Sequence, residues 1–249
     1  MKTEIVYGIH PVFEAIRAGR RDAFKVFVSV GDPSKRLAPV VQLAQGRGIP
    51  IETVDSGKLK ALSGTGAHQG VCARVTPYPW GSWEELTEAV NHPGRRCLLL
   101  VLDHVVDPHN LGALVRTALC AGVDGVIMAK DRSAPPSPAA SKASAGALEH
   151  IRLVRVTNLV RSLKELKAHG VWVFGLDRQA RQSLFSSDLT DSLAIIVGGE
   201  AKGIRPLVRS ECDQLIAIPQ VGDLNSLNAS AAGAVVLYEA FRQRSQADI

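Results

Sequence analysis

A small set of polar residues next to apolar stretches has the side chains needed to bind and orient a ligand. Asn110 and Arg116 belong to a helical pattern but lie off its apolar stripe. An arginine at the carboxyl edge of a parallel sheet is well placed to hold a phosphate, because its fork of donors matches the phosphate oxygens. Glu200 could accept hydrogen bonds from a ligand or orient Arg116. The simpler alternatives are a surface arginine in an ion pair and an asparagine that caps its helix.

Two glycines precede Glu200 and follow a buried-strand pattern at Ile195–Val197. Because glycine has no Cβ, a ligand can approach the backbone closely at Gly198 and Gly199. The stretch is not a phosphate-binding loop of the Walker type, since no Lys-Ser or Lys-Thr pair follows Gly203. It is not a dinucleotide fingerprint either, since no GxGxxG sequence opens a helix after the first strand of the sheet.

The stretch from Ile216 to Ala240 predicts a strand, a turn and a long helix, which is a common way to build a ligand pocket. The strand ends at Pro219, and Ser226–Ser230 opens the helix, whose first backbone N–H groups have no partner within the helix. Apolar residues at helical spacing predict that this helix packs against the core. These residues are Leu227, Ala231, Val235, Tyr238 and Phe241.

Apolar strand patterns alternate with helical patterns from residue 96 onward, which predicts an α/β domain with a parallel sheet. The expected strands are Cys97–Leu102, Val123–Ala129, Ile151–Val156, Val171–Gly175, Leu193–Gly198 and Leu215–Ile218. The expected helices are Asn110–Ala121, Ala139–Leu148, Leu159–Ala168 and Ser226–Arg242. The pattern alone favours an unknotted doubly wound fold, because knots are very rare.

Residues 1–76 show a smaller α/β pattern, which we interpret as a separate N-terminal domain. A stretch rich in Pro and Gly at 77–95 is the expected linker, and 96–249 the expected second domain. Residues 1–75 contain 11 Lys and Arg against 6 Asp and Glu, whereas residues 76–249 contain 18 of each. This asymmetry favours a basic module that meets a polyanion, with ordinary surface solubility as the alternative.

The composition, with 46% hydrophobic and 21% charged residues, is that of a soluble globular protein. No apolar run is long enough to cross a bilayer, and the first residues lack the apolar core of a signal peptide. The four cysteines, Cys72, Cys97, Cys120 and Cys212, form no CxxC and no zinc spacing. They predict reduced core cysteines in a cytoplasmic protein and no metal site.

Three stretches together resemble the motifs of the SpoU/TrmH branch of knotted S-adenosylmethionine-dependent RNA methyltransferases. The first motif is Asp107-Pro108-His109-Asn110-Leu111-Gly112 with Arg116, the second is Ile195-Ile196-Val197-Gly198-Gly199-Glu200 with Gly203, and the third is Pro219, Gly222 and Ser226-Leu227-Asn228 with Ser230. They follow the order of the family at plausible spacing. Three further stretches resemble the bacterial family members that act on ribosomal RNA. They are Tyr7-Gly8-Ile9-His10-Pro11, His68-Gln69-Gly70 and Lys130-Asp131-Arg132-Ser133. The resemblance covers essentially the whole chain.

The resemblance implies a methyl donor, S-adenosyl-L-methionine, and a set of site residues. The residues implied to bind the donor, largely through main-chain atoms, are Gly198, Gly199, Ile218, Leu227 and Ala229. The residues implied to serve catalysis are Arg116, Asn110, Glu200, Ser226 and Asn228. Gln220 stands where the family usually has methionine, and Ala229 where valine is common, which puts fine substrate preference in doubt.

The resemblance also implies a deep C-terminal trefoil knot, an N-terminal RNA-binding domain like ribosomal protein L30e, and a homodimer with its active site at the interface. In such a dimer the Arg116 side chain would act at the donor pocket of the partner subunit. The implied reaction is 2′-O-methylation of a guanosine in the peptidyl-transferase P loop of 23S ribosomal RNA. The alternatives are a ribose in transfer RNA or elsewhere in ribosomal RNA, and a ribosome-assembly factor that binds RNA without catalysis.

Overall fold

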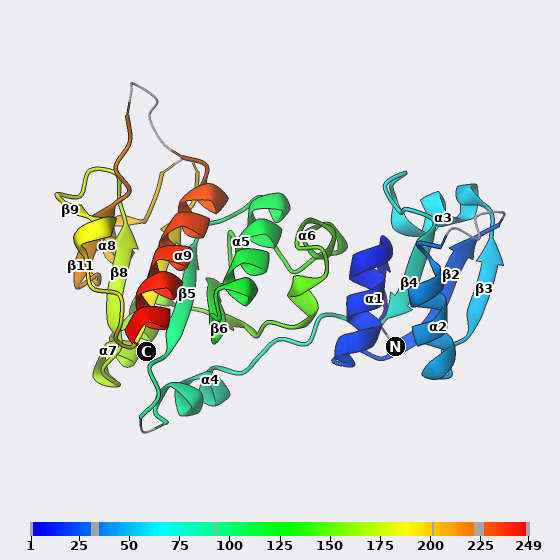
Figure 1. The fold of residues 1–249 in the computed structure, drawn as a ribbon, viewed down its shortest axis with the longest axis horizontal. Coiled ribbons are helices and arrows are strands. Elements are labelled where there is room, and N and C mark those ends of the chain that lie inside the picture. Colours follow the sequence, from blue (N-terminus) through cyan, green and yellow to red (C-terminus); the bar gives the residue numbers. More distant parts are fainter. Residues whose placement is uncertain (1, 31–34, 93, 201, 222–226, 248–249) are drawn as a thin grey trace. The chain divides into compact units, whose positions relative to one another are not determined.

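The structure is a computed structural model that describes residues 2–30, 35–92, 94–200, 202–221 and 227–247. The chain forms two compact units. Unit 1 comprises Met1–Pro79 together with Pro135–His150, and unit 2 comprises Trp80–Ala134 and Ile151–Ile249. Each unit has a sheet and helices of its own (Figure 1).

In the described part of unit 1, four strands form a mixed sheet in the order β1-β4-β2-β3. The strands are β1 (Glu4–Tyr7), β2 (Ala23–Ser29), β3 (Ile51–Val54) and β4 (Val71–Val75). The helices before residue 80 are α1 (Ile9–Ala18), α2 (Ala38–Gly46) and α3 (Ser56–Ser63). Apolar side chains of α1, α2 and the sheet form one core, which includes Val6, Val12 and Val26. Strand β1 has only four residues, which are too few for a periodic signal in the sequence.

A segment from the second half of the chain completes unit 1. Helix α6 (Pro138–Ala143) and the 3-10 turn η1 (Ala147–Glu149) contact α1, and α6 also contacts β1. The carboxylate of Glu149, with a side chain only 1% exposed, lies 2.9 Å from Nε of Arg21. Burial raises the pKa of Glu149, and the charge of Arg21 acts in the opposite direction. The strand and helix pattern had grouped this segment with 96–249, because periodicity does not show which core a helix joins.

The ion pair between Arg21 and Glu149 gives a stability prediction for unit 1. We expect Arg21→Ala to lower the free energy of unfolding by about 3–5 kcal/mol, because it leaves a buried carboxylate without its cation. Denaturant unfolding, with hydrogen exchange followed in α1 and α6, measures the loss. The matched control is Lys25→Ala, since Lys25 pairs with Glu52 at 3.1 Å on the surface. An equal loss in the two variants would contradict the buried pair's role.

In the described part of unit 2, seven strands form a sheet in the order β7-β6-β5-β10-β8-β11-β9, and every pair is parallel. The strands are β5 (Leu98–Asp103), β6 (Gly125–Ala129), β7 (Leu153–Val156), β8 (Trp172–Leu176), β9 (Gln182–Ser183), β10 (Leu193–Gly198) and β11 (Gln214–Ala217). The helices are α4 (Trp83–Val90), α5 (Pro108–Cys120), α7 (Leu159–Ala168), α8 (Pro206–Arg209) and α9 (Ala229–Ala247), with a 3-10 turn η2 (Leu184–Ser186). The predicted α/β class with a parallel sheet is confirmed.

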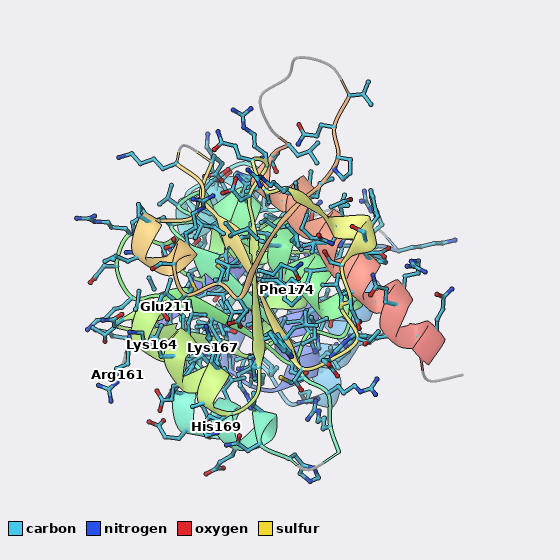
Figure 2. All side chains as sticks on the ribbon, turned by 90° about the vertical axis from the view of Figure 1, so that its left-hand side faces the viewer. Arg161, Lys164, Lys167, His169, Phe174 and Glu211 are labelled. Atoms are coloured by element: carbon cyan, nitrogen blue, oxygen red, sulfur yellow. The ribbon has the colours of Figure 1, made fainter. Side chains whose placement is uncertain are left out.

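Helices cover both faces of this sheet. Residues of α4, α7 and α8 share one core cluster with the central strands. Helices α5 and α9 contact each other, and α9 also contacts β10. Figure 2 shows α7 and α9 on opposite sides of the sheet. Strand β5 is buried along its whole length, which explains its continuous apolar sequence.

The C-terminal helix begins at Ala229 rather than Ser226, and its core-facing side differs from the predicted one. Tyr238 and Phe241 were expected in the core, but their side chains are 51% and 44% exposed. The buried positions are Val236, Leu237 and Ala240, each with 0% exposure. The prediction was wrong for the single chain because the helix has apolar residues on two faces. Periodicity identifies both stripes and does not say which one meets this chain's own core.

The four cysteines differ in burial. Cys72 and Cys97 are buried and Cys212 is half-buried, but Cys120 is exposed, so the expectation of four core cysteines fails there. Burial raises the pKa of Cys72 to about 11 and that of Cys212 to about 12, which keeps both thiols protonated.

In the residues that the structure describes, no helix is both long and apolar enough to cross a membrane. The same residues contain no cluster of His, Cys, Asp and Glu suited to a metal ion.

Candidate active site

The first motif places Asn110 in the first turn of α5, just after strand β5. The Asp107 side chain caps this helix by accepting a hydrogen bond from the backbone N–H of His109 at 2.9 Å. Pro108 occupies the first turn, where its missing N–H costs nothing. Asn110 is 8% exposed. Arg116 lies farther along the helix with its side chain exposed.

The second motif is a tight turn held against the end of β5. The N–H of Gly199 donates to the carbonyl of Asp103 at 2.9 Å, and the N–H of Gly203 donates to the carbonyl of Gly199 at 2.9 Å. A Cβ on Gly198 would clash with the backbone of Gly203, and one on Gly199 with the carbonyl oxygen of His104. The glycines are therefore required by close approach of the protein's own backbone, whereas the sequence suggested approach of a ligand.

Gly199→Ala tests this account of the turn. We expect the added methyl to push the turn away from His104 and to weaken methyl-donor binding at least about tenfold, because a binding site must keep its geometry to within a fraction of an ångström. Calorimetry with S-adenosylmethionine measures the effect. Gly66→Ala is the control, because a Cβ at Gly66 meets no atom within 4 Å and the φ of Gly66 is not positive. Similar donor affinity in Gly199→Ala and the wild type would show that the turn tolerates the shift.

Of the third motif, Pro219 and the residues from Leu227 onward are described, whereas Gly222 and Ser226 lie outside the described residues. The Asn228 side chain acts as the cap of α9. Its Oδ1 accepts hydrogen bonds from the backbone N–H and the hydroxyl of Ser230, at 2.9 and 2.6 Å. This arrangement fixes the direction in which the amide nitrogen of Asn228 points.

One chain of hydrogen bonds joins residues of all three motifs. Asn228 Nδ2 donates to Asn110 Oδ1 at 3.1 Å. Asn110 Nδ2 in turn donates to Glu200 Oε1. The cap of α9, the first turn of α5 and the turn after β10 are thus held in one arrangement. A carboxylate can accept several hydrogen bonds, so Glu200 keeps acceptor capacity for a further donor besides Asn110.

A cavity of about 610 Å³ opens beside this network, at the carboxyl ends of β8, β10 and β11. The size falls within the range of roughly 300–1,000 Å³ found for small-molecule sites. All five residues expected to bind the donor line it: Gly198, Gly199, Ile218, Leu227 and Ala229. Glu200 lines it as well, whereas Asn110, Asn228 and Arg116 are not among its lining residues.

The sequence interpretation missed one wall of this cavity. Leu176 lines it from the end of β8, and Asp177, Arg178 and Gln179 line it from the loop that follows. Asp177 is held there by an ion pair with Arg209 at 2.8 Å. The signal was available, because parallel strands end at the same edge of a sheet and β8 had been predicted. Polar residues just after its end could have been added to the site on that ground.

Comparisons with known proteins agree with these features. The profile of the SpoU rRNA Methylase family matches residues 97–238, and a profile described as RNA 2'-O ribose methyltransferase substrate binding matches residues 5–81. The 23S rRNA (guanosine-2'-O-)-methyltransferase RlmB of Escherichia coli strain K12 is 39% identical over 246 residues, which are 98% of this chain and 100% of that protein. RlmB of Xylella fastidiosa is 40% identical over 244 residues, 98% of each chain.

A solved structure has the same fold over nearly the whole chain. The SpoU methyltransferase AviRb from Streptomyces viridochromogenes, in complex with AdoMet, superposes with a TM-score of 0.81 at 24% identity, covering 98% of this chain and 91% of that one. The two sequence relatives and the two profiles match the same chain from its first strand to its last helix. This protein is therefore a member of the SpoU rRNA Methylase family.

Proposed function

We propose that the protein is an S-adenosylmethionine-dependent methyltransferase that methylates the ribose 2′-OH of a guanosine in 23S ribosomal RNA. The observation that carries this proposal is the hydrogen-bond chain of Asn228, Asn110 and Glu200 beside a cavity of donor size. Two RlmB relatives, each about as long as this chain and 39–40% identical to it, are 23S rRNA guanosine methyltransferases by name. The AviRb structure contains AdoMet, which supports the same donor here.

The proposed donor site uses backbone more than side chains. Gly198, Gly199, Ile218, Leu227 and Ala229 line the cavity, and none of them carries a charge or a side-chain hydrogen-bonding group. Bound S-adenosylmethionine supplies a methyl group on a sulfonium, which is already electrophilic. The protein's task is to align the ribose hydroxyl with that methyl and to assist loss of its proton. No metal ion is part of the proposed chemistry.

We assign positioning of the ribose to Arg116. A guanidinium stays protonated in proteins, so it is a poor proton acceptor. It can hold a phosphate or stabilise the developing alkoxide while water takes the proton. Glu200 has free acceptor capacity and Asn110 a fixed amide, which suits them to orient the hydroxyl. Ser226, as a further catalytic residue, stays a prediction.

Arg116 is exposed and does not line the cavity of its own chain. In a homodimer the same side chain can reach the cavity of the partner subunit. The apolar side chains that remain outside the core support such a dimer, because Leu227, Tyr238 and Phe241 are 40–51% exposed along α9 and its start. We therefore propose that the exposed apolar side of α9, which includes Tyr238 and Phe241, is the interface between two copies of the chain.

Unit 1 is proposed to bind the RNA. Its sequence matches a substrate-binding profile, and residues 1–75 carry the whole excess of positive charge. We further propose an L30e-like fold for unit 1 and a trefoil knot in unit 2. The proposed site of action is the cytoplasm, where bacterial ribosomes are assembled. The second candidate function is ribose methylation of transfer RNA or of another ribosomal nucleotide. The third is a non-catalytic role in ribosome assembly.

Methyl transfer to defined RNAs tests the proposal. The protein is incubated with tritiated S-adenosylmethionine and, in parallel, with unmodified 23S ribosomal RNA and bulk transfer RNA. We expect label in the ribosomal RNA. Label in transfer RNA alone would keep the chemistry and replace the substrate. Donor binding by calorimetry without transfer to either RNA, or to assembly intermediates, would support the non-catalytic factor.

A further inference from the structure

A buried carboxylate holds an arginine in a fixed position at the edge of the candidate site. Asp103, at the end of β5, is 0% exposed. Its Oδ1 accepts a hydrogen bond from Nε of Arg205 at 2.7 Å, and its Oδ2 accepts one from the backbone N–H of Arg205 at 2.8 Å. The Arg205 side chain is 39% exposed. Across the described residues its two terminal nitrogens have no hydrogen-bond partner, so this edge of the guanidinium is free to bind a ligand.

Two neighbouring loops carry basic residues in an unusual backbone conformation. His104 follows β5 with φ of 62°, and Arg132 follows β6 with φ of 56°. Strands β5 and β6 are adjacent and parallel, so both residues lie at the same edge of the sheet. The loops are joined by a hydrogen bond from the N–H of Ala134 to the carbonyl of Val105 at 2.8 Å. Left-handed residues other than glycine persist where the surrounding structure fixes them, and such positions concentrate at functional sites.

Positive charge gathers around His104. Burial lowers the pKa of His104 most, Arg205 lowers it further, and Arg132 and Lys202 act in the same direction, against the opposing charge of Asp103. Lys202 belongs to the second-motif turn and lines the donor cavity. In the part of the chain that the structure describes, neither Arg132 nor Lys202 has an ion-pair partner. The one carboxylate among these groups is already engaged by Arg205.

We propose that Arg205, Arg132 and Lys202 form a binding site for a backbone phosphate of the RNA strand, next to the donor cavity. The proposal rests on the proposed RNA methyltransferase function and adds to it the residues that grip the strand near the target ribose. A guanidinium fork anchored by a carboxylate is suited to bidentate phosphate binding, because its orientation is fixed before the ligand arrives. Arg132 and Lys202 supply the further charge that a phosphodiester needs.

Charge-removing variants test the site through RNA affinity. Arg132→Gln and the double variant Arg132→Gln/Lys202→Gln are compared with the wild type on unmodified 23S ribosomal RNA. We expect KM for RNA and the Kd from fluorescence anisotropy to rise about tenfold or more in both variants. In the single variant Arg132→Gln, both kcat at saturating RNA and the donor Kd should stay within about twofold of the wild type. The slope of log K against log salt should become shallower by roughly 0.7 for each single-strand phosphate that the variant no longer neutralises.

Two further variants sharpen the test. Arg205→Lys keeps the charge but removes the fork, so RNA affinity should fall while the salt slope stays close to that of the wild type. Lys164→Gln is the control, since Lys164 is an exposed cation on α7 (Figure 2), and no residue of α7 lines the donor cavity. It should leave RNA affinity unchanged within about twofold.

A second readout follows His104 itself. Its imidazole signal in NMR titrations, assigned with His104→Gln, should show a higher pKa when RNA is bound, because a nearby phosphate stabilises the protonated ring. Wild-type methyl transfer together with unchanged KM, Kd and salt slope in the double variant would overturn the phosphate site and leave the proposed function standing. Failure of the wild type to methylate any RNA would overturn the function, and the anisotropy and salt slopes would still decide whether these residues bind RNA.

Discussion

Arg116→Ala is expected to lose about 10²–10³-fold in kcat, the usual cost of removing one group that stabilises the charge developing in a transition state. Donor affinity should stay within about threefold of the wild type, because the Arg116 side chain does not line the donor cavity of its own chain. Single-turnover transfer to 23S ribosomal RNA and calorimetry with S-adenosylmethionine measure the two effects separately.

The control for this variant is Arg161→Ala, which removes an exposed arginine from α7 in the same unit (Figure 2). It should retain near-normal turnover. Arg116→Lys adds information on geometry, because an ammonium keeps the charge but cannot make a bidentate contact. A near-normal rate for Arg116→Ala would remove this residue from the catalytic role.

Mixing two inactive variants should restore activity, because their heterodimer contains one complete site. In the proposed dimer each site combines the cavity of one chain with Arg116 of the other. Arg116→Ala lacks the arginine, and Glu200→Ala lacks the carboxylate at the cavity. A heterodimer of the two therefore contains one complete site. Random pairing at equal concentrations makes half of the dimers mixed, so we expect about a quarter of the wild-type rate, against about 1% or less for either variant alone.

The mixing experiment distinguishes two arrangements of the site. If Arg116 served the cavity of its own chain, the heterodimer would have one site lacking Glu200 and one lacking Arg116, and mixing would restore nothing. Differently tagged chains, denatured together and refolded, give the heterodimer for a direct assay. Absence of recovery in a purified heterodimer would contradict the shared site, and a monomeric wild type in analytical ultracentrifugation would contradict the dimer itself.

The fold of unit 2 was largely predictable because buried parallel strands have strong sequence signals. Leu98–Asp103 and Leu193–Gly198 are buried on both faces and read as continuous apolar runs. Short elements such as α8 have no sequence signal, since four residues carry no periodicity. The partner of a helix was harder to predict. Neither the packing of α6 in unit 1 nor the exposed stripe of α9 could be read from spacing, because both depend on which surface lies opposite.

The candidate site was predicted in part. The resemblance singled out Asn110, Glu200 and Asn228, and the structure joins them by hydrogen bonds although they are up to 118 positions apart. Spacing within each motif could not have shown that contact, since it depends on the order of the strands. The role of the glycines differed from the expected one, because the closest neighbour of Gly199 is the backbone at His104. Arg205 was missed because its significance comes from a buried partner, Asp103.

A nucleotide map of 23S ribosomal RNA after methylation by the purified protein tests the proposed activity most directly. Unmodified RNA is treated with S-adenosylmethionine and enzyme, digested, and analysed by mass spectrometry for the position and the atom that carries the new methyl group. We expect a single 2′-O-methylguanosine, in the peptidyl-transferase P loop that the family resemblance implies. A methyl group on a base, or no modified guanosine in 23S ribosomal RNA from an enzyme that binds the donor, would contradict it.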